Sequence, residues 1–179
     1  MEKQSSITFR GLQAATLDDK GRMAVPKRFR ETLQQVCQGV AVPKRFRETL
    51  QQVCQGEVVL TVDIHDACLL LYPMVDWQAI EAKLMAMPNM DPATRRVQRL
   101  LLGHAVEMEM DSAGRILVPD LLRDYAQMTK EVMLVGQGNK IEFWSAETWQ
   151  TQRQAWIQAT REELSTDLSP SSPLMGLSL

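Results

Sequence analysis

The stretch LDDKGRMAVPKRFRETL, residues 17–33, returns in diverged form as MDSAGRILVPDLLRDYA, residues 110–126. Both segments read apolar-Asp-x-x-Gly-Arg-apolar-x-Val-Pro-x-x-x-Arg, with every shared residue 93 positions apart. The arginines that end this pattern are Arg30 and Arg123. Self-similarity of this length indicates two homologous modules in one chain.

Each module has a predictable local structure. Asp-x-x-Gly-Arg predicts a tight turn, because aspartate accepts bonds from nearby backbone N–H groups and glycine adopts a left-handed conformation cheaply. A short strand follows each turn, and Pro26 and Pro119 suit the first turn of a helix. Apolar runs and period-two alternation predict the remaining strands at 8–17, 57–64, 67–73, 104–110, 131–136 and 140–144.

The segments outside the modules read as helices and a tail. Apolar spacing predicts linking helices at 76–87 and 93–104, separated by PNMDP, and a final helix with Ser145 as its N-cap. The Ser/Pro-rich tail from residue 165 is expected to be disordered. We therefore expect an α+β chain, mainly β, divided into a first module at 9–75, a helical linker at 76–103, a second module at 104–148, and a C-terminal helix with a disordered tail at 149–179.

Composition is that of an ordinary soluble protein. The 179 residues are 45% hydrophobic and 23% charged, and no apolar run approaches the roughly 20 residues of a membrane helix. The N-terminus lacks the apolar core of a secretory signal. The cysteines at 37, 54 and 68 form no CxxC pair, which favours buried thiols in a reducing cytoplasm over a disulfide framework or a zinc site.

Catalysis has little support in the sequence. The histidines are His65 and His104, and the chain has no HExxH, GxSxG, P-loop or CxxC motif. We expect no enzymatic activity, no cofactor and no metal.

The distribution of charge points weakly to a polyanionic partner. The chain carries a net charge of −2, yet residues 20–56 hold eight basic and two acidic residues. A solvated helix face explains these basic clusters about equally well. The sharper feature is the arginine after each turn glycine, Arg22 and Arg115, with Lys20 and Arg10 near the first turn in sequence. Arginine presents a rigid fork of donors that suits phosphate oxygens and guanine edges.

These motifs resemble the AbrB/SpoVT-like swapped-hairpin DNA-binding modules, and FRG, LDDKGRMAVPKRFRE, DIHDACLLLYP, RRVQRLLLGHA, MDSAGRILVP and TKEVMLVGQGNKIEFW together resemble the MraZ family. The resemblance implies a swapped-hairpin barrel of two ββαββ modules. It also implies a cytoplasmic, nucleoid-associated regulator of the division and cell-wall gene cluster. Such a protein assembles as a homo-oligomeric ring and binds double-stranded DNA at direct repeats in its own promoter.

The same resemblance implies DNA binding through the two turn elements, Asp18 with Arg22 and Asp111 with Arg115, and turn chemistry and nearness in sequence add the other site residues. DNA is expected to contact Arg22, Lys20, Arg115 and Arg10, while Asp18, Gly21, Asp111 and Gly114 shape the turns. Lys20 matches a basic position only in the first module, because the second has Ala113. The first turn is therefore expected to bind more strongly than the second.

Two other readings remain open. The turns could bind another protein within a non-enzymatic scaffold. The chain could also be an antitoxin-like regulator of the AbrB type, although two modules in one chain disfavour this reading.

An exact repeat interrupts the first module. AVPKRFRETLQQVCQG occupies residues 24–39 and again 41–56, a period of 17. Perfect identity indicates a recent in-frame duplication or a sequence artefact. The second module has one helix between its strands, so only one copy can fill the corresponding place in the first. We expect the second copy to pack there through Phe46, Leu50 and Val53, with Phe29, Leu33 and Val36 of the first copy as a nearly equal alternative.

Overall fold

The computed structural model describes residues 8–38 and 57–165. The second copy of the exact repeat and the predicted disordered tail after residue 165 lie outside these described residues. The chain divides into two compact units, residues 1–146 and residues 147–179. All strands of both modules lie within the first unit.

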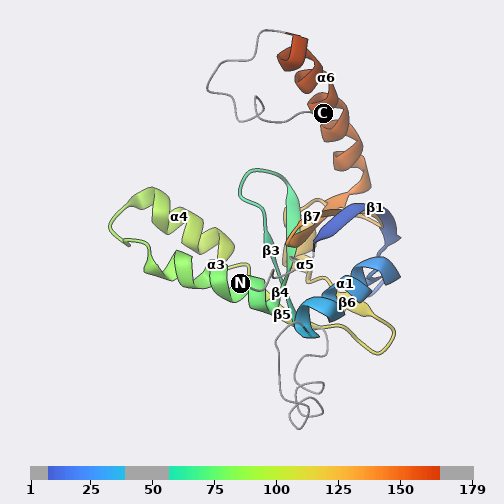
Figure 1. Cartoon of the computed structure of the whole chain (residues 1–179), viewed down its shortest axis with the longest axis horizontal. Helices are drawn as coiled ribbons and strands as arrows, with labels where there is room; N and C mark the ends of the chain where they lie inside the picture. The colour runs from blue at the N-terminus through green and yellow to red at the C-terminus, as the bar shows by residue number, and fades with distance from the viewer. Residues whose placement is uncertain (1–7, 39–56, 166–179) are drawn as a thin grey trace, which may run out of the picture. The chain divides into compact units, whose positions relative to one another are not determined.

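The two modules have the same order of elements, which is the order expected from the sequence. The fold is α+β and mainly strands, as predicted, and Figure 1 follows it along the chain. The first module contains β1 (Phe9–Thr16), β2 (Arg22–Ala24), α1 (Lys27–Gln38), β3 (Glu57–Val62) and β4 (Cys68–Pro73). The second contains β5 (Val106–Glu109), β6 (Arg115–Leu117), α5 (Asp120–Tyr125), β7 (Glu131–Gly138) and β8 (Lys140–Ser145).

The modules are interleaved through their strands. The large antiparallel sheet has the order β1-β7-β8-β4-β3-β5, so the first strand of each module pairs with the third strand of the other. The short strands β2 and β6 pair with each other in a separate two-stranded ribbon. Because each module completes the sheet of the other, the chain consists of tandem AbrB-like units with exchanged hairpins, and neither module forms a separate compact unit.

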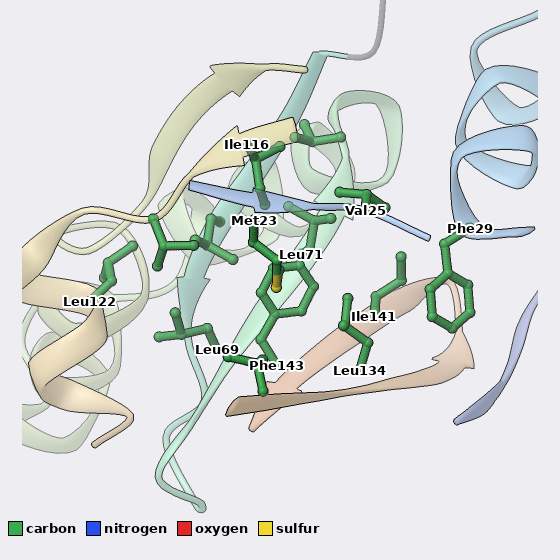
Figure 2. Close-up of a cluster of buried hydrophobic side chains, with 14 of the residues drawn as sticks. Met23, Val25, Phe29, Leu69, Leu71, Ile116, Leu122, Leu134, Ile141 and Phe143 are labelled. Carbon is green, nitrogen blue, oxygen red and sulfur yellow. The ribbon is translucent and has the colours of Figure 1, made fainter. Parts of the chain in front are cut away.

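One hydrophobic core joins the two modules. In the β2–β6 ribbon Met23 lies directly opposite Ile116, and both side chains are fully buried. Figure 2 shows them in one cluster with Leu71 and Phe143 of the large sheet. Burying an apolar side chain of this size stabilises a fold by about 1.5–3 kcal/mol. The ribbon is therefore held to the sheet by apolar residues from both modules.

The first copy of the exact repeat packs against this core. Phe29 and Leu33 of α1 are buried, and the Phe29 ring meets Phe9 edge to face with 6.3 Å between centroids. The expectation that the second copy fills this place is therefore wrong. The physical reason is continuity of the chain: Val25 is buried at the end of the ribbon, and Pro26 starts the helix at once. In the sequence, the second copy stands between α1 and β3, outside the described residues.

Two linker helices connect the modules. They are α3 (Met74–Ala86) and α4 (Pro92–Leu101), the latter capped by Asp91, whose carboxylate accepts the Thr94 backbone N–H at 2.7 Å. The Thr61 hydroxyl of β3 donates to the Leu101 carbonyl at 2.7 Å. The α4 end is thus fixed to the sheet.

The final helix, α6 (Ala146–Ser165), starts directly after Ser145, which is the last residue of β8. Within it, Trp149 and Trp156 meet edge to face at 5.8 Å between ring centroids. No helix in residues 8–38 and 57–165 is long and apolar enough to cross a membrane.

Candidate nucleic-acid interface

The first Asp-x-x-Gly-Arg turn is closed by its own aspartate. Asp18 Oδ1 accepts the backbone N–H groups of Lys20 and Arg22, each at 2.9 Å. The Gly21 N–H donates to the Asp18 carbonyl at 2.9 Å, and Gly21 has a φ of +74°. Only glycine adopts such a φ without strain, so carboxylate and glycine together define the turn.

The second turn repeats this geometry 93 residues later. Asp111 Oδ1 accepts the backbone N–H groups of Ala113 and Arg115 at 2.9 Å, and the Gly114 N–H donates to the Asp111 carbonyl at 2.8 Å. Gly114 has a φ of +73°. Two diverged sequences therefore build the same turn, because the residues they share are those that the turn requires.

Each aspartate also orients the arginine of its turn. Arg22 Nε donates to Asp18 Oδ2 at 2.8 Å, and Arg115 Nε donates to Asp111 Oδ2 at the same distance. The two arginine side chains remain 38% and 41% exposed. A guanidinium carries five N–H donors, so an arginine held at Nε keeps donors for an outside ligand.

The two turn carboxylates are stabilised in their charged form. The Arg22 backbone N–H, followed by its side chain, lowers the pKa of Asp18. The Arg115 backbone N–H and then its side chain lower the pKa of Asp111. Because each charged carboxylate offsets its own arginine, attraction to a polyanion must come from the other cations and from the geometry of the donors.

The β2–β6 ribbon brings the two arginines together. Arg22 lies opposite Leu117 and Arg115 lies opposite Ala24 in the antiparallel register. The two arginines are diagonal neighbours, a relation in which residues lie about 7–8 Å apart. Side chains alternate along a strand, and since Met23 is buried, both arginines lie on the outward face. We call this outward face of Arg22, Ala24, Arg115 and Leu117 the ribbon face.

The other two predicted DNA contacts are placed differently from each other. Lys20 is exposed at the tip of the first turn, beside the ribbon face. Arg10 is exposed at the far end of β1, opposite Gln137. At about 3.3 Å per residue, the strand separates Arg10 from Leu17 by roughly 20 Å. Nearness in sequence therefore does not bring Arg10 to the turn.

Two further cations were missed by motif reasoning. Lys27 and Arg28 are exposed at the start of α1, directly after the ribbon. The equivalent residues of the second module, 93 positions on, are Asp120 and Leu121. These cations differ between the modules, so a motif built from shared residues does not include them. Comparing the exposed positions of the two modules identifies them.

The described residues do not assemble a metal centre. No group of three or more His, Cys, Asp or Glu side chains in this part of the chain could hold a metal ion. Cys68 is a free thiol buried in β4, and burial raises its pKa. A thiol in this environment is a poor nucleophile.

Comparison with known proteins decides the family. A sequence model described as "MraZ protein, putative antitoxin-like" matches residues 39–100 and 101–169. The chain belongs to the MraZ family. A MraZ relative from Hydrogenovibrio crunogenus, named a transcriptional regulator, is 46% identical over 93% of this chain and 99% of its own length. Relatives with the same name are 49% identical: one from Yersinia pestis strain Pestoides F covers 96% of this chain and 99% of itself, and one from Pectobacterium carotovorum covers 93% of each.

The MraZ match also bears on the exact repeat. The first matched segment begins at residue 39, so it takes in the second copy and leaves out the turn at 18–22. The second matched segment includes the turn at 111–115. The sequence match and the packing of the core thus select different copies of the same sixteen residues, as expected when the copies are identical.

Proposed function

We propose that this MraZ chain is a transcriptional regulator that binds double-stranded DNA through the ribbon face. The observation that carries the proposal is the placement of Arg22 and Arg115, one from each module, on one outward face with each guanidinium held by a turn aspartate. Held arginines lose little conformational freedom on binding, and their remaining donors suit phosphate oxygens and base edges.

The two halves of the interface are expected to contribute unequally. Lys20 is an exposed cation at the first turn, whereas Lys27 and Arg28 lie at the start of α1, whose Arg30 contacts the second turn. The residue equivalent to Lys20 is Ala113, and α5 begins with Asp120 and Leu121 where α1 has Lys27 and Arg28. We expect the turn and helix of the first module to supply most of the salt-dependent attraction to phosphates, with the second module contributing mainly Arg115.

One chain supplies few cations, so we further propose that several copies bind together. The family resemblance favours a homo-oligomeric ring on direct repeats in the promoter of the division and cell-wall gene cluster. Linked identical sites raise avidity without new contacts when the spacing of the DNA repeats matches the spacing of the subunits.

A salt titration of binding tests this function. DNA from the region upstream of the gene is titrated with protein, and unrelated DNA of equal length serves as the control. We expect tight retention of the upstream fragment at low salt, a preference over the control DNA, and steep loss of affinity as salt rises. A large assembly by light scattering without DNA retention at low salt would instead support the scaffold reading.

A further inference from the structure

We propose that Arg30 and Arg123 are positioning residues that hold the DNA-binding turns across the module boundary. Each arginine lies on the helix of one module and contacts the glycine turn of the other. The consequence for DNA rests on the function proposed above, whereas the contact itself is a property of the free protein.

The first contact runs from α1 to the second turn. Arg30 Nη1 donates to the Ala113 carbonyl at 3.3 Å. The Arg30 side chain also lies so close to Gly114 that a Cβ at this position would collide with it. The glycine therefore serves two purposes, because it allows the positive φ and leaves room for the arginine of the other module.

The reciprocal contact runs from α5 to the first turn. A Cβ built on Gly21 would lie 3.0 Å from Cζ and 3.2 Å from Nε of Arg123. Asp120 accepts a bond from Arg123 Nη2 and so orients this guanidinium from its own helix. Both halves of the fold thus place the last arginine of the repeated pattern on the glycine of the opposite turn.

Backbone hydrogen bonds also join each turn glycine to the other module. The Val25 N–H donates to the Gly114 carbonyl, and the Val118 N–H donates to the Gly21 carbonyl, both at 2.9 Å. Each turn glycine is thus fixed on its backbone by the ribbon strand of the other module and on its open side by an arginine. This double constraint sets where the turn, and with it Arg22 or Arg115, stands relative to the ribbon.

The Nε atoms distinguish these two arginines from those of the ribbon face, whose Nε atoms donate to the turn aspartates. Among the described residues, Arg30 Nε and Arg123 Nε are buried without a hydrogen-bond partner. An unpaired buried N–H costs free energy, so the arrangement requires compensation from the contacts of the remaining side chain. We infer that these contacts with the opposite turn provide it, and that the two arginines act through the turns.

The test measures the turns without DNA. Arg30→Lys keeps the positive charge and removes the planar fork, and Arg123→Lys does the same on the other helix. Amide hydrogen exchange at Gly21 and Gly114 is followed by NMR in the full chain. We expect Arg30→Lys to speed exchange several-fold at Gly114 and leave Gly21 unchanged, and Arg123→Lys to do the reverse. Gln34→Ala, at an exposed position of α1, is the matched control and should change neither.

Two outcomes would overturn the proposal. If either variant speeds both glycines equally, the arginine supports only general stability. If DNA affinity falls while both amides exchange at the wild-type rate, the arginine contacts DNA directly. DNA binding is measured in parallel, so a wild-type chain that fails to bind DNA refutes the proposed function and leaves the exchange result interpretable.

Discussion

Arg22 and Arg115 come from modules 93 residues apart and lie diagonally across a ribbon of only three residue pairs. Arg22 opposes Leu117 and Arg115 opposes Ala24, so both guanidinium groups lie on one outward face. The exchange of hairpins between modules creates this relationship. A chain with one module could make the same face only by pairing with a second copy.

The turn glycines should differ in their tolerance of a side chain. Gly114→Ala introduces strain at a φ of +73° and forces Arg30 to move. Gly138→Ala is the matched control, because Gly138 has a φ of +68° with open space around its Cβ position. We expect about 1 kcal/mol of destabilisation from strain in the control and about 1–3 kcal/mol more at Gly114. Chemical denaturation measures both, and equal losses would show that Arg30 does not occupy the space beside Gly114.

The exact repeat allows two identical residues in identical local sequence to be compared. Phe29→Ala removes a fully buried ring that contacts Phe9 and should cost about 3–5 kcal/mol of unfolding free energy. Phe46→Ala changes the same residue of the other copy and should cost far less. Thermal and denaturant unfolding distinguish them, and a larger loss at Phe46 would mean that the second copy packs on the core in solution.

Removing one 17-residue period should leave the fold and DNA binding intact. One helix suffices between β2 and β3, as α5 suffices between β6 and β7. The shortened connection also loses less entropy on folding. We expect an equal or higher melting temperature with unchanged DNA affinity. Loss of folding would show that both copies are needed.

Acidic pH should loosen the two turns, because it protonates their aspartates. The folded-state pKa values of Asp18 and Asp111 lie below the ordinary 3.8. A depressed folded pKa contributes stability above the unfolded value, and that contribution is lost as pH falls through about 4 and below. The Asp18→Asn and Asp111→Asn double variant lacks these carboxylates, so its stability should fall less between pH 5 and pH 3 (values chosen to bracket the ordinary pKa). A parallel fall in both proteins would contradict the assignment.

The two turns differ in that Lys20 of the first is matched by Ala113 in the second, and substitution at either position tests what the lysine contributes to DNA binding. Lys20→Ala should lower DNA affinity and reduce the slope of log affinity against log salt by about 0.9, the value for one phosphate contact. Ala113→Lys should raise affinity and steepen the slope by a similar amount if the second turn also faces phosphate. Binding titrations at several salt concentrations measure both slopes. An unchanged slope for Lys20→Ala would remove Lys20 from the interface.

Local patterns were enough to predict the order of elements and the turns. Aspartate, glycine and proline act within a few residues, so their effect on Asp18–Arg22 can be read from the sequence. Strand pairing between modules could not be read in this way, because any period-two strand fits several partners in a sheet. The cross-module contacts of Arg30 and Arg123 depend on that pairing. The repeated sequence pattern includes both arginines but does not indicate what they contact. The choice between Phe29 and Phe46 was likewise beyond sequence, since their neighbours are identical.

The most direct test of the central claim is DNA binding by the Arg22→Ala and Arg115→Ala double variant. Fluorescence anisotropy with the upstream fragment at moderate salt compares it with wild type and with Arg96→Ala, an exposed arginine of α4. An arginine contact is worth about 1–3 kcal/mol, so we expect at least about a tenfold rise in Kd for the double variant. Arg96→Ala should stay near wild type. A folded double variant that binds DNA as tightly as wild type would contradict the ribbon face as the interface.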